Sequence, residues 1–318
     1  MTSWRTCTRE TSVKTTVAKI NPRSISRAAA LLRAGQVVAF PTETVYGLGA
    51  NALNGGAVKK IFAAKGRPQD NPVLVHIADE KMLQMLVRKI PPRAQKLISH
   101  FWPGPLTLVL EARPAVPRVV TAGLPTVAVR MPAHKAALGL IRQAGVPIAA
   151  PSANTSGKPS PTRADHVAQD LRGKIPLILD GGSSQHGVES TIVAFPRGKA
   201  IMLRPGAIPR EAIERIIGPV RLATAKSKVQ APGMKYRHYA PRALLVLTKG
   251  NPQIVRAEYT ARKVKVFPAG TLSLKNLYAS LRAADAKGFE VVIAQAVPEK
   301  GEGLALMNRL RKAASRVC

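Results

Sequence analysis

The 318-residue sequence is poor in cysteine, in aromatic residues and in acidic residues. Its two cysteines, Cys7 and Cys318, stand at opposite ends of the chain and predict neither a disulfide framework nor a Cys-x-x-Cys metal clip. A protein with so little cysteine is typical of a reducing compartment, and we expect a cytoplasmic location. Aromatic residues make up only 4% of the chain, too few for a platform on which RNA bases stack.

Long apolar runs and standard cofactor motifs are also missing from the sequence. No apolar run approaches the roughly 20 residues that cross a bilayer, so we expect no membrane association. The first twenty residues are polar and basic and lack the apolar core of a secretory signal. The sequence has no GxxxxGK[ST] phosphate loop and no HExxH pair, and its six histidines have no cysteine companions, so we expect no protein-bound metal.

The scarcity of acidic residues leaves a strong positive charge. Lys and Arg together number 49 against 17 Asp and Glu, which gives a formal net charge of +32. Such a field favours polyanionic partners, and RNA binding through the basic surface is one reading. A solvated surface is the other, because the charge is spread along the chain and marks no single face. A double-stranded-RNA-binding module without catalysis therefore stays open as one alternative function.

The main body of the chain alternates strand-like and helical stretches. A helix is expected over residues 25–35, and another is indicated by the one-face spacing of Val58, Ile61, Phe62 and Lys65. Seven apolar runs predict buried strands: 36–41, 73–78, 106–110, 126–131, 147–150, 177–180 and 190–195. Several of them follow one another directly, which indicates an α/β domain with a twisted mixed sheet, and we assign it residues 20–218.

The last third of the chain divides into a linker and a second domain. Residues 219–241 are rich in proline, glycine and basic residues without an apolar period, so we interpret them as a linker. Residues 242–318 alternate strands with helices around 277–287 and 304–314, which predicts a smaller open α/β domain.

Three loops carry the polar residues from which a site could be built. PTETVYGLGAN, at 41–51, follows a strand as a ligand-binding loop would, or is a tight turn that satisfies its own amides. KGRPQDNP, at 65–72, offers two cations to anionic oxygens, or is a helix end with a glycine cap. PSANTSGKPSPT, at 151–162, presents small hydroxyls and amides at a strand end, with Thr162 as a possible helix cap.

These strings in this order resemble the YrdC-like family of threonylcarbamoyl-AMP synthases. The matching segments run from about Ala28 to Gly218: FPTETVYGLGANA, KGRPQDNPVLVHI, FWPGPLT, APSANTSGKPSPT, GVESTIV and LRPGAI. The segment APGMKYRHYAP and the ending GLALMNRLRKAA further resemble the long, two-domain form of the family. The resemblance implies a YrdC-like catalytic domain followed by a Rossmann-like C-terminal domain.

The resemblance also implies a reaction and its participants. L-threonine, bicarbonate or CO2 and ATP would give threonylcarbamoyl-adenylate and pyrophosphate, with Mg²⁺ carried by ATP. The adenylate would then pass to partner proteins that transfer the threonylcarbamoyl group to a tRNA adenosine. A carbamoyl-transferring relative that uses carbamoyl phosphate is the second alternative. Such a protein should carry extra acylphosphatase or zinc-finger segments, and the chain has no cysteine pairs for such fingers.

The family's functional residues carry over onto matching positions of this sequence. A catalytic tetrad would fall on Lys65, Arg67, Ser152 and Asn154. L-threonine would be bound by Thr44, His76, Arg130, the backbone near Ala150, and Ser190. ATP would be bordered by Arg67, Asn71, Thr126, Ser152, Ser160 and Arg204, with Tyr239 closing over it as a lid. We expect Arg130 to pair with the amino-acid carboxylate. From the residues alone, Arg130, Ser190 and Arg204 are equally well explained as ordinary strand ends.

Overall fold

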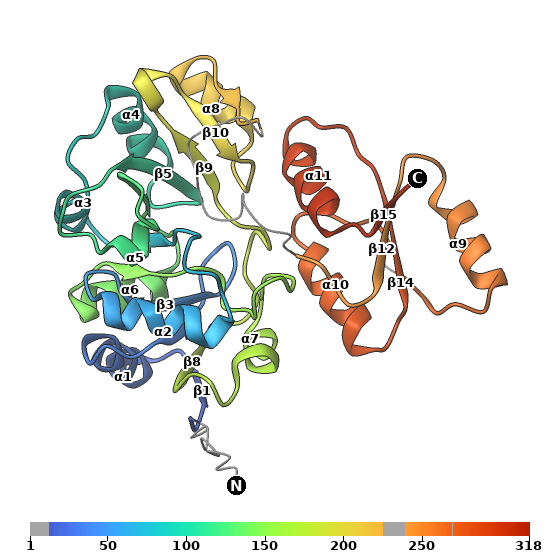
Figure 1. Ribbon diagram of the computed structural model, residues 1–318, viewed down its shortest axis with the longest axis horizontal. Helices are drawn as coiled ribbons and strands as arrows, with labels where there is room; N and C mark the ends of the chain where they lie inside the picture. The colour runs from blue at the N-terminus through green and yellow to red at the C-terminus, as the bar shows by residue number, and fades with distance from the viewer. Residues whose placement is uncertain (1–12, 225–238, 269) are drawn as a thin grey trace, which may run out of the picture.

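The computed structural model describes residues 13–224, 239–268 and 270–318. Across these residues the strands form one eleven-stranded sheet and one four-stranded sheet, each with its own helices (Figure 1). Parallel and antiparallel pairs are mixed in the large sheet, whereas the small one is parallel throughout. The predicted α/β class and the smaller C-terminal α/β unit are confirmed.

The large sheet has the strand order β1-β8-β2-β3-β7-β4-β6-β5-β9-β10-β11. Its strands are β1 (Thr16–Lys19), β2 (Val38–Phe40), β3 (Gly47–Asn51), β4 (Leu74–His76), β5 (Leu106–Glu111), β6 (Thr126–Arg130), β7 (Ile148–Ala149), β8 (Leu177–Asp180), β9 (Thr191–Ala194), β10 (Ile201–Arg204) and β11 (Arg221–Leu222). All seven predicted strands are present. Neighbouring strands in the sheet are often distant in the chain, so loops from separate segments meet at its edges.

Eight helices accompany these strands in the described part of the larger unit. They are α1 (Pro22–Arg33), α2 (Gly55–Lys65), α3 (Glu80–Leu86), α4 (Pro92–Phe101), α5 (Arg118–Thr121), α6 (Lys135–Ala144), α7 (Ala164–Leu171) and α8 (Arg210–Ile217). The expected cap at Thr162 is wrong: Arg163 is the residue before α7, and the Thr162 hydroxyl instead lies 3.4 Å from Nδ1 of His166.

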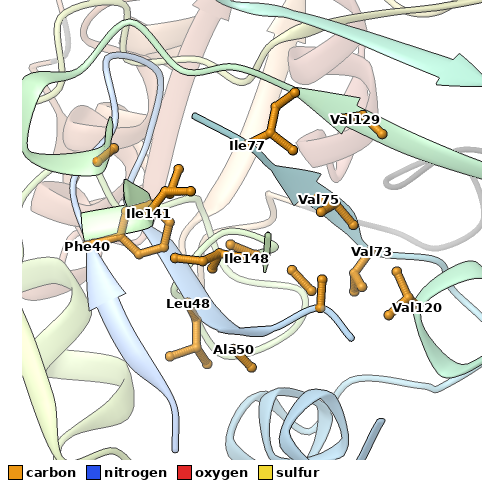
Figure 2. Packing of buried hydrophobic residues seen from close by; sticks show 14 of the residues in the cluster. Phe40, Leu48, Ala50, Val73, Val75, Ile77, Val120, Val129, Ile141 and Ile148 are labelled. Atoms are coloured by element: carbon orange, nitrogen blue, oxygen red, sulfur yellow. The ribbon is translucent and has the colours of Figure 1, made fainter. Parts of the chain in front are cut away.

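The segment predicted as a loop at 41–51 ends in a strand. Gly47–Asn51 form β3, which pairs antiparallel with β2 and with β7. A Cβ at Gly49 would lie 2.7 Å from both the Phe40 ring and the Ile148 side chain, so this position requires glycine. Figure 2 shows Phe40, Leu48 and Ile148 packed together in the core. The glycines therefore serve close packing in a strand.

The small sheet has the order β13-β14-β12-β15. Its elements are β12 (Leu244–Thr248), α9 (Pro252–Ala261), β13 (Val266–Phe267), α10 (Leu277–Ala286), β14 (Val291–Gln295), α11 (Glu302–Ala313) and β15 (Arg316–Val317). The elements α9 and β15 were not predicted. In Figure 1, α10 and α11 lie between the small sheet and the larger unit, and α9 lies on the opposite face.

The segment interpreted as a linker is described only at its two ends. Arg221 and Leu222 form β11, which pairs with β10 and so extends the large sheet. Residues 225–238 lie outside the described residues, and with them most of the predicted lid; Tyr239 is described. Among the described residues, no helix has the length and apolar character needed to cross a membrane.

Candidate active site

Lys65 and Arg67 stand on either side of the glycine that ends α2. Gly66 adopts the left-handed conformation, with φ of 59°, and its amide bonds back to the last turn of the helix. The glycine-cap reading of this segment is thus confirmed. Burial, followed by the nearby Arg67 charge, lowers the pKa of Lys65 well below its usual range. The buried Nζ of Lys65 donates to the carbonyl oxygens of Ser152 and Asn154, both at 2.5 Å. Lys65 therefore holds the 151–162 loop from beneath.

Arg67 turns toward a cavity above this contact. Its Nη2 donates to the carbonyl oxygen of Pro72 at 3.0 Å and reaches that of Asn71 at 3.4 Å. Asn71 is buried and does not line the cavity, so its contact with the site runs through Arg67. The guanidinium is thus fixed at the cavity wall by the main chain of the following turn.

The loop that Lys65 holds is braced by its own side chains. Ser152 Oγ donates to Oδ1 of Asn154 at 2.6 Å. The amide nitrogen of Asn154 donates to the carbonyl oxygens of Thr155 at 2.8 Å and Lys158 at 3.0 Å. An isolated bridge also joins Ser152 to Gly47 of β3. The loop therefore presents Ser152 and Asn154 in a fixed arrangement.

One cavity gathers most of the residues predicted for the site. It is lined by Thr44, Arg67, His76, Arg130, Ala150, Ser152, Asn154, Ser160, Ser190, Arg204 and Tyr239, all of which were predicted. Lys65, Asn71 and Thr126 do not line it. Thr126 begins β6 opposite Glu111, whereas Arg130 ends the strand, so the two lie four residue steps, or about 13 Å, apart.

Arg130 has a partner that the sequence interpretation missed. Its Nη2 lies 2.5 Å from Oε1 of Glu43, its Nη1 donates to the hydroxyl of Thr44 at 2.8 Å, and its Nε donates to the carbonyl oxygen of Gly104 at 3.1 Å. Burial raises the pKa of Glu43, but the Arg130 charge and the Ala133 amide outweigh that effect and leave the pKa lowered. Glu43 is therefore an anion that fixes the Arg130 guanidinium at the cavity.

His76 is a neutral ring in the cavity wall. Burial, followed by the nearby Arg130 charge, lowers its pKa to about 3. Its Nδ1 has no hydrogen-bond partner within the described ranges. A neutral imidazole in a cavity wall can exchange a hydrogen bond with a polar ligand without adding charge.

A second buried carboxylate, Glu189, was also missed. It accepts hydrogen bonds from Ser160 Oγ at 2.7 Å, from the Tyr278 hydroxyl at 2.9 and 3.0 Å, and from Arg309 Nε at 2.9 Å. Burial raises its pKa, but the charges of Arg309 and Arg204 and the Ser160 contact lower it to about 2. The only signal was its place in the GVESTIV string, next to Ser190.

Arg204 and Tyr239 line the cavity near Glu189, and Arg204 bonds to the neighbouring Ser190. Arg204 donates to the carbonyl oxygen of Ser190 from Nε at 3.2 Å and from Nη2 at 3.0 Å. The ring of Tyr239 stacks on that of Tyr278, with centroids 5.3 Å apart, and the guanidinium carbon of Arg309 lies 5.4 Å from its centroid. The cavity thus has one end built around Arg130 and His76 and another built around Glu189 and Arg204.

Comparison with known proteins gives the chain relatives along nearly its full length. A family model described as "Telomere recombination", which groups Sua5, YciO and YrdC proteins, matches residues 30–206. A model described as the C-terminal domain of threonylcarbamoyl-AMP synthase matches residues 208–315.

Individual relatives support the same assignment. The threonylcarbamoyl-AMP synthase of Pyrococcus abyssi is 50% identical over 323 residues, which cover 93% of this chain and 95% of that protein. The synthase of Bacillus subtilis is 49% identical, with 92% and 94% covered. A crystal structure of P. abyssi Sua5 complexed with L-threonine superposes with a TM-score of 0.88 at 47% identity, covering 96% of this chain and 98% of the other.

Proposed function

The chain belongs to the threonylcarbamoyl-AMP synthase family, and on that premise we infer that it makes L-threonylcarbamoyl-adenylate and pyrophosphate from L-threonine, bicarbonate or CO2 and ATP. The observation that carries this function is the gathering of Arg67, Ser152 and Asn154, with Lys65 beneath them, around a cavity that also holds Arg130.

The reaction joins two anions, so the site must neutralise charge and align the reactants. The amine of threonine takes up CO2 and loses a proton to form a carbamate. One carbamate oxygen then attacks the α-phosphorus of ATP, the bond to the β-phosphate oxygen breaks, and pyrophosphate leaves. Arg67 provides positive charge where phosphate oxygens crowd together, and Ser152 and Asn154 provide neutral hydrogen bonds. Lys65 fixes the loop that carries both.

We assign the threonine end of the cavity to Thr44, His76, Arg130, Ala150 and Ser190. A guanidinium has five N–H donors, and the contact with Glu43 uses only part of that set on Arg130. Further N–H groups of Arg130 therefore remain for a substrate carboxylate. His76 has a pKa of about 3 and is too weak a base to deprotonate an ammonium, so we assign it a hydrogen bond to the substrate. The P. abyssi protein solved with L-threonine supports binding of this amino acid.

We assign the other end of the cavity to ATP, with Arg67, Ser160, Arg204 and Tyr239 around it. Asn71 and Thr126 do not line the cavity, and Asn71 would act through Arg67. The carboxylate in this wall, Glu189, is already bonded to Ser160, Tyr278 and Arg309, and the described residues form no cluster of acidic or histidine ligands. We therefore propose that Mg²⁺ arrives with ATP and is held through its phosphates.

Pyrophosphate release tests this function. We expect release from ATP only when threonine and bicarbonate are both present, and loss of release in Arg67→Met. Arg118→Met is the matched control, because Arg118 is exposed and lies outside the cavity lining. Release that continues without threonine would contradict the function. Release that needs carbamoyl phosphate in place of bicarbonate would favour the carbamoyl-transfer alternative.

We also propose a setting for the product. Because a mixed carbamic-phosphoric anhydride is labile in water, it should pass directly to proteins that transfer the threonylcarbamoyl group to tRNA in the cytoplasm. The net charge of +32 supports direct contact of this chain with RNA. Binding to tRNA that weakens steeply with salt would support that contact, and no measurable binding at low salt would contradict it.

A further inference from the structure

The C-terminal unit contacts the active-site loop through one face of α10. Tyr278 and Arg282 are four residues apart and so lie on the same side of this helix. Both side chains are buried, and their polar ends bond to residues of the larger unit. Figure 1 shows α10 and α11 on the side of the small sheet that faces the larger unit.

Arg282 holds the loop at Pro159. Its Nε and Nη2 donate to the Pro159 carbonyl oxygen at 3.1 and 2.6 Å, so both arms of the fork meet one acceptor. Nη2 also lies 2.8 Å from Oδ2 of Asp170. Asp170 in turn accepts from the Thr155 amide at 3.3 Å and from Lys158 Nζ at 3.0 Å. Arg282 of α10 thus contacts the loop directly at Pro159. Through Asp170 it also contacts the loop at Thr155 and Lys158.

Tyr278 and Arg309 hold the next residue of the same loop. The Tyr278 hydroxyl and Arg309 Nε both donate to Glu189, which accepts from Ser160 Oγ at 2.7 Å. Glu189 belongs to the larger unit, whereas its two donors come from α10 and α11. The position of the Ser160 hydroxyl therefore depends on side chains more than 100 residues further along the chain.

We propose that Tyr278, Arg282 and Arg309 are positioning residues that fix the 151–162 loop for nucleotide binding. The C-terminal unit holds Pro159 directly and Ser160 through Glu189. Lys65 holds the other part of the loop, at Ser152 and Asn154. Tyr278 and Arg309 bond to Glu189, and Arg282 bonds to Asp170. Both carboxylates in turn accept hydrogen bonds from the loop. The C-terminal unit thereby forms part of the ATP end of the site without touching the substrate itself.

This proposal rests on the function inferred above, because it assigns Ser160 to the ATP end. It predicts a selective kinetic effect. A displaced loop weakens ATP binding, whereas the threonine end, built around Arg130 and Glu43, keeps its own contacts. General loss of folding would lower the amount of active enzyme without separating the two Michaelis constants.

Two mild variants test it. Tyr278→Phe removes the hydroxyl bonded to Glu189 and keeps the ring that stacks on Tyr239. Arg282→Lys keeps the charge beside Asp170 and loses the fork that holds Pro159. Removal of Arg309 is avoided, because it would leave Glu189 buried without its cation and could unfold the chain. Glu211→Ala is the control: it removes a contact between the units, to the Gly301 amide at 3.2 Å, away from the loop.

In both variants we expect the KM for ATP to rise roughly tenfold and the KM for threonine to change less than about twofold, with Glu211→Ala like the wild type. Amide hydrogen exchange of residues 153–160 should also become faster by roughly tenfold. Wild-type KM for ATP and wild-type exchange in both variants would overturn the proposal. The exchange measurement needs no catalysis. If the wild-type chain released no pyrophosphate, the proposed function would be refuted, and the exchange rates of the two variants would still decide whether these residues fix the loop.

Discussion

The side-chain nitrogen of Lys65 lies 2.5 Å from the main-chain carbonyl oxygen of Ser152, a residue 87 positions further along the chain. A second carbonyl oxygen, that of Asn154, lies at the same distance. The lysine that ends α2 therefore supports the 151–162 loop. Of the two basic residues flanking Gly66, Lys65 supports the site and Arg67 lines it.

Lys65→Met tests the supporting role. Methionine keeps the length of the side chain but leaves one buried and one partly buried carbonyl oxygen without this donor, and each such loss costs up to about 1 to 3 kcal/mol. We expect the free energy of unfolding in urea to fall by roughly 2 to 5 kcal/mol and pyrophosphate release to slow by at least about tenfold. Lys60→Met is the control, since Lys60 lies on the exposed side of the same helix, where it donates to the carbonyl oxygen of Gly35. Equal stability and activity of the two variants would refute the role.

Arg130→Lys tests the carboxylate assignment. Lysine keeps a charge near Glu43 but has no planar fork with which to bind a second carboxylate. Alanine is less informative, because an unpaired buried Glu43 would cost about 3 to 5 kcal/mol of stability. We expect the KM for threonine to rise roughly tenfold, with that for ATP nearly unchanged. Arg142→Lys, at an exposed position on α6, is the control, and equal threonine KM values in both variants would contradict the assignment.

Tyr239→Ala tests whether the aromatic contact protects the product. The ring stacks on Tyr278 at the nucleotide end of the cavity, so its loss opens that end to water. We expect more AMP per pyrophosphate released, because the adenylate is hydrolysed before it leaves. Tyr239→Phe keeps the stacked ring and should stay close to the wild-type ratio. A wild-type ratio in the alanine variant would remove Tyr239 from this role.

The buried His76 predicts a dependence of stability on pH. Its folded pKa is about 3, below the ordinary 6.5, so between these values the unfolded chain binds a proton that the folded chain does not. Stability should therefore fall as the pH drops below 6.5, by roughly 2 kcal/mol at pH 5 from this residue. The free energy of unfolding in urea should fall less between pH 7 and pH 5 in His76→Gln than in His100→Gln, the exposed control. The same loss in both variants would contradict the shift.

Much of the site could be predicted because its parts lie in short strings. Lys65, Gly66 and Arg67 are adjacent, and Ser152 and Asn154 share one loop after β7. Strands β4, β6 and β9 were recognisable as apolar runs. The first two end at the cavity residues His76 and Arg130, and β9 begins directly after the cavity residue Ser190. Local pattern thus gave both the elements and the polar residues at their ends.

What escaped prediction depends on pairing between distant segments. Glu43 faces Arg130 across 87 residues, and Glu189 meets Arg309 across 120, so no local spacing relates them. The strand at Gly47–Asn51 was read as a loop because glycine seldom favours strands, and its reason, the Phe40 ring against Gly49, exists only in the folded sheet.

The central claim is that this cavity joins threonine, a one-carbon unit and the adenylate of ATP. The most direct measurement is a reaction with labelled threonine, ¹⁴C-bicarbonate and α-³²P-ATP, followed by separation of the products. The account predicts one product that carries all three labels in the wild type and none of it in Arg67→Met. A wild-type reaction that yields phosphorus-labelled AMP without carbon from either source, at any threonine concentration, would contradict the account.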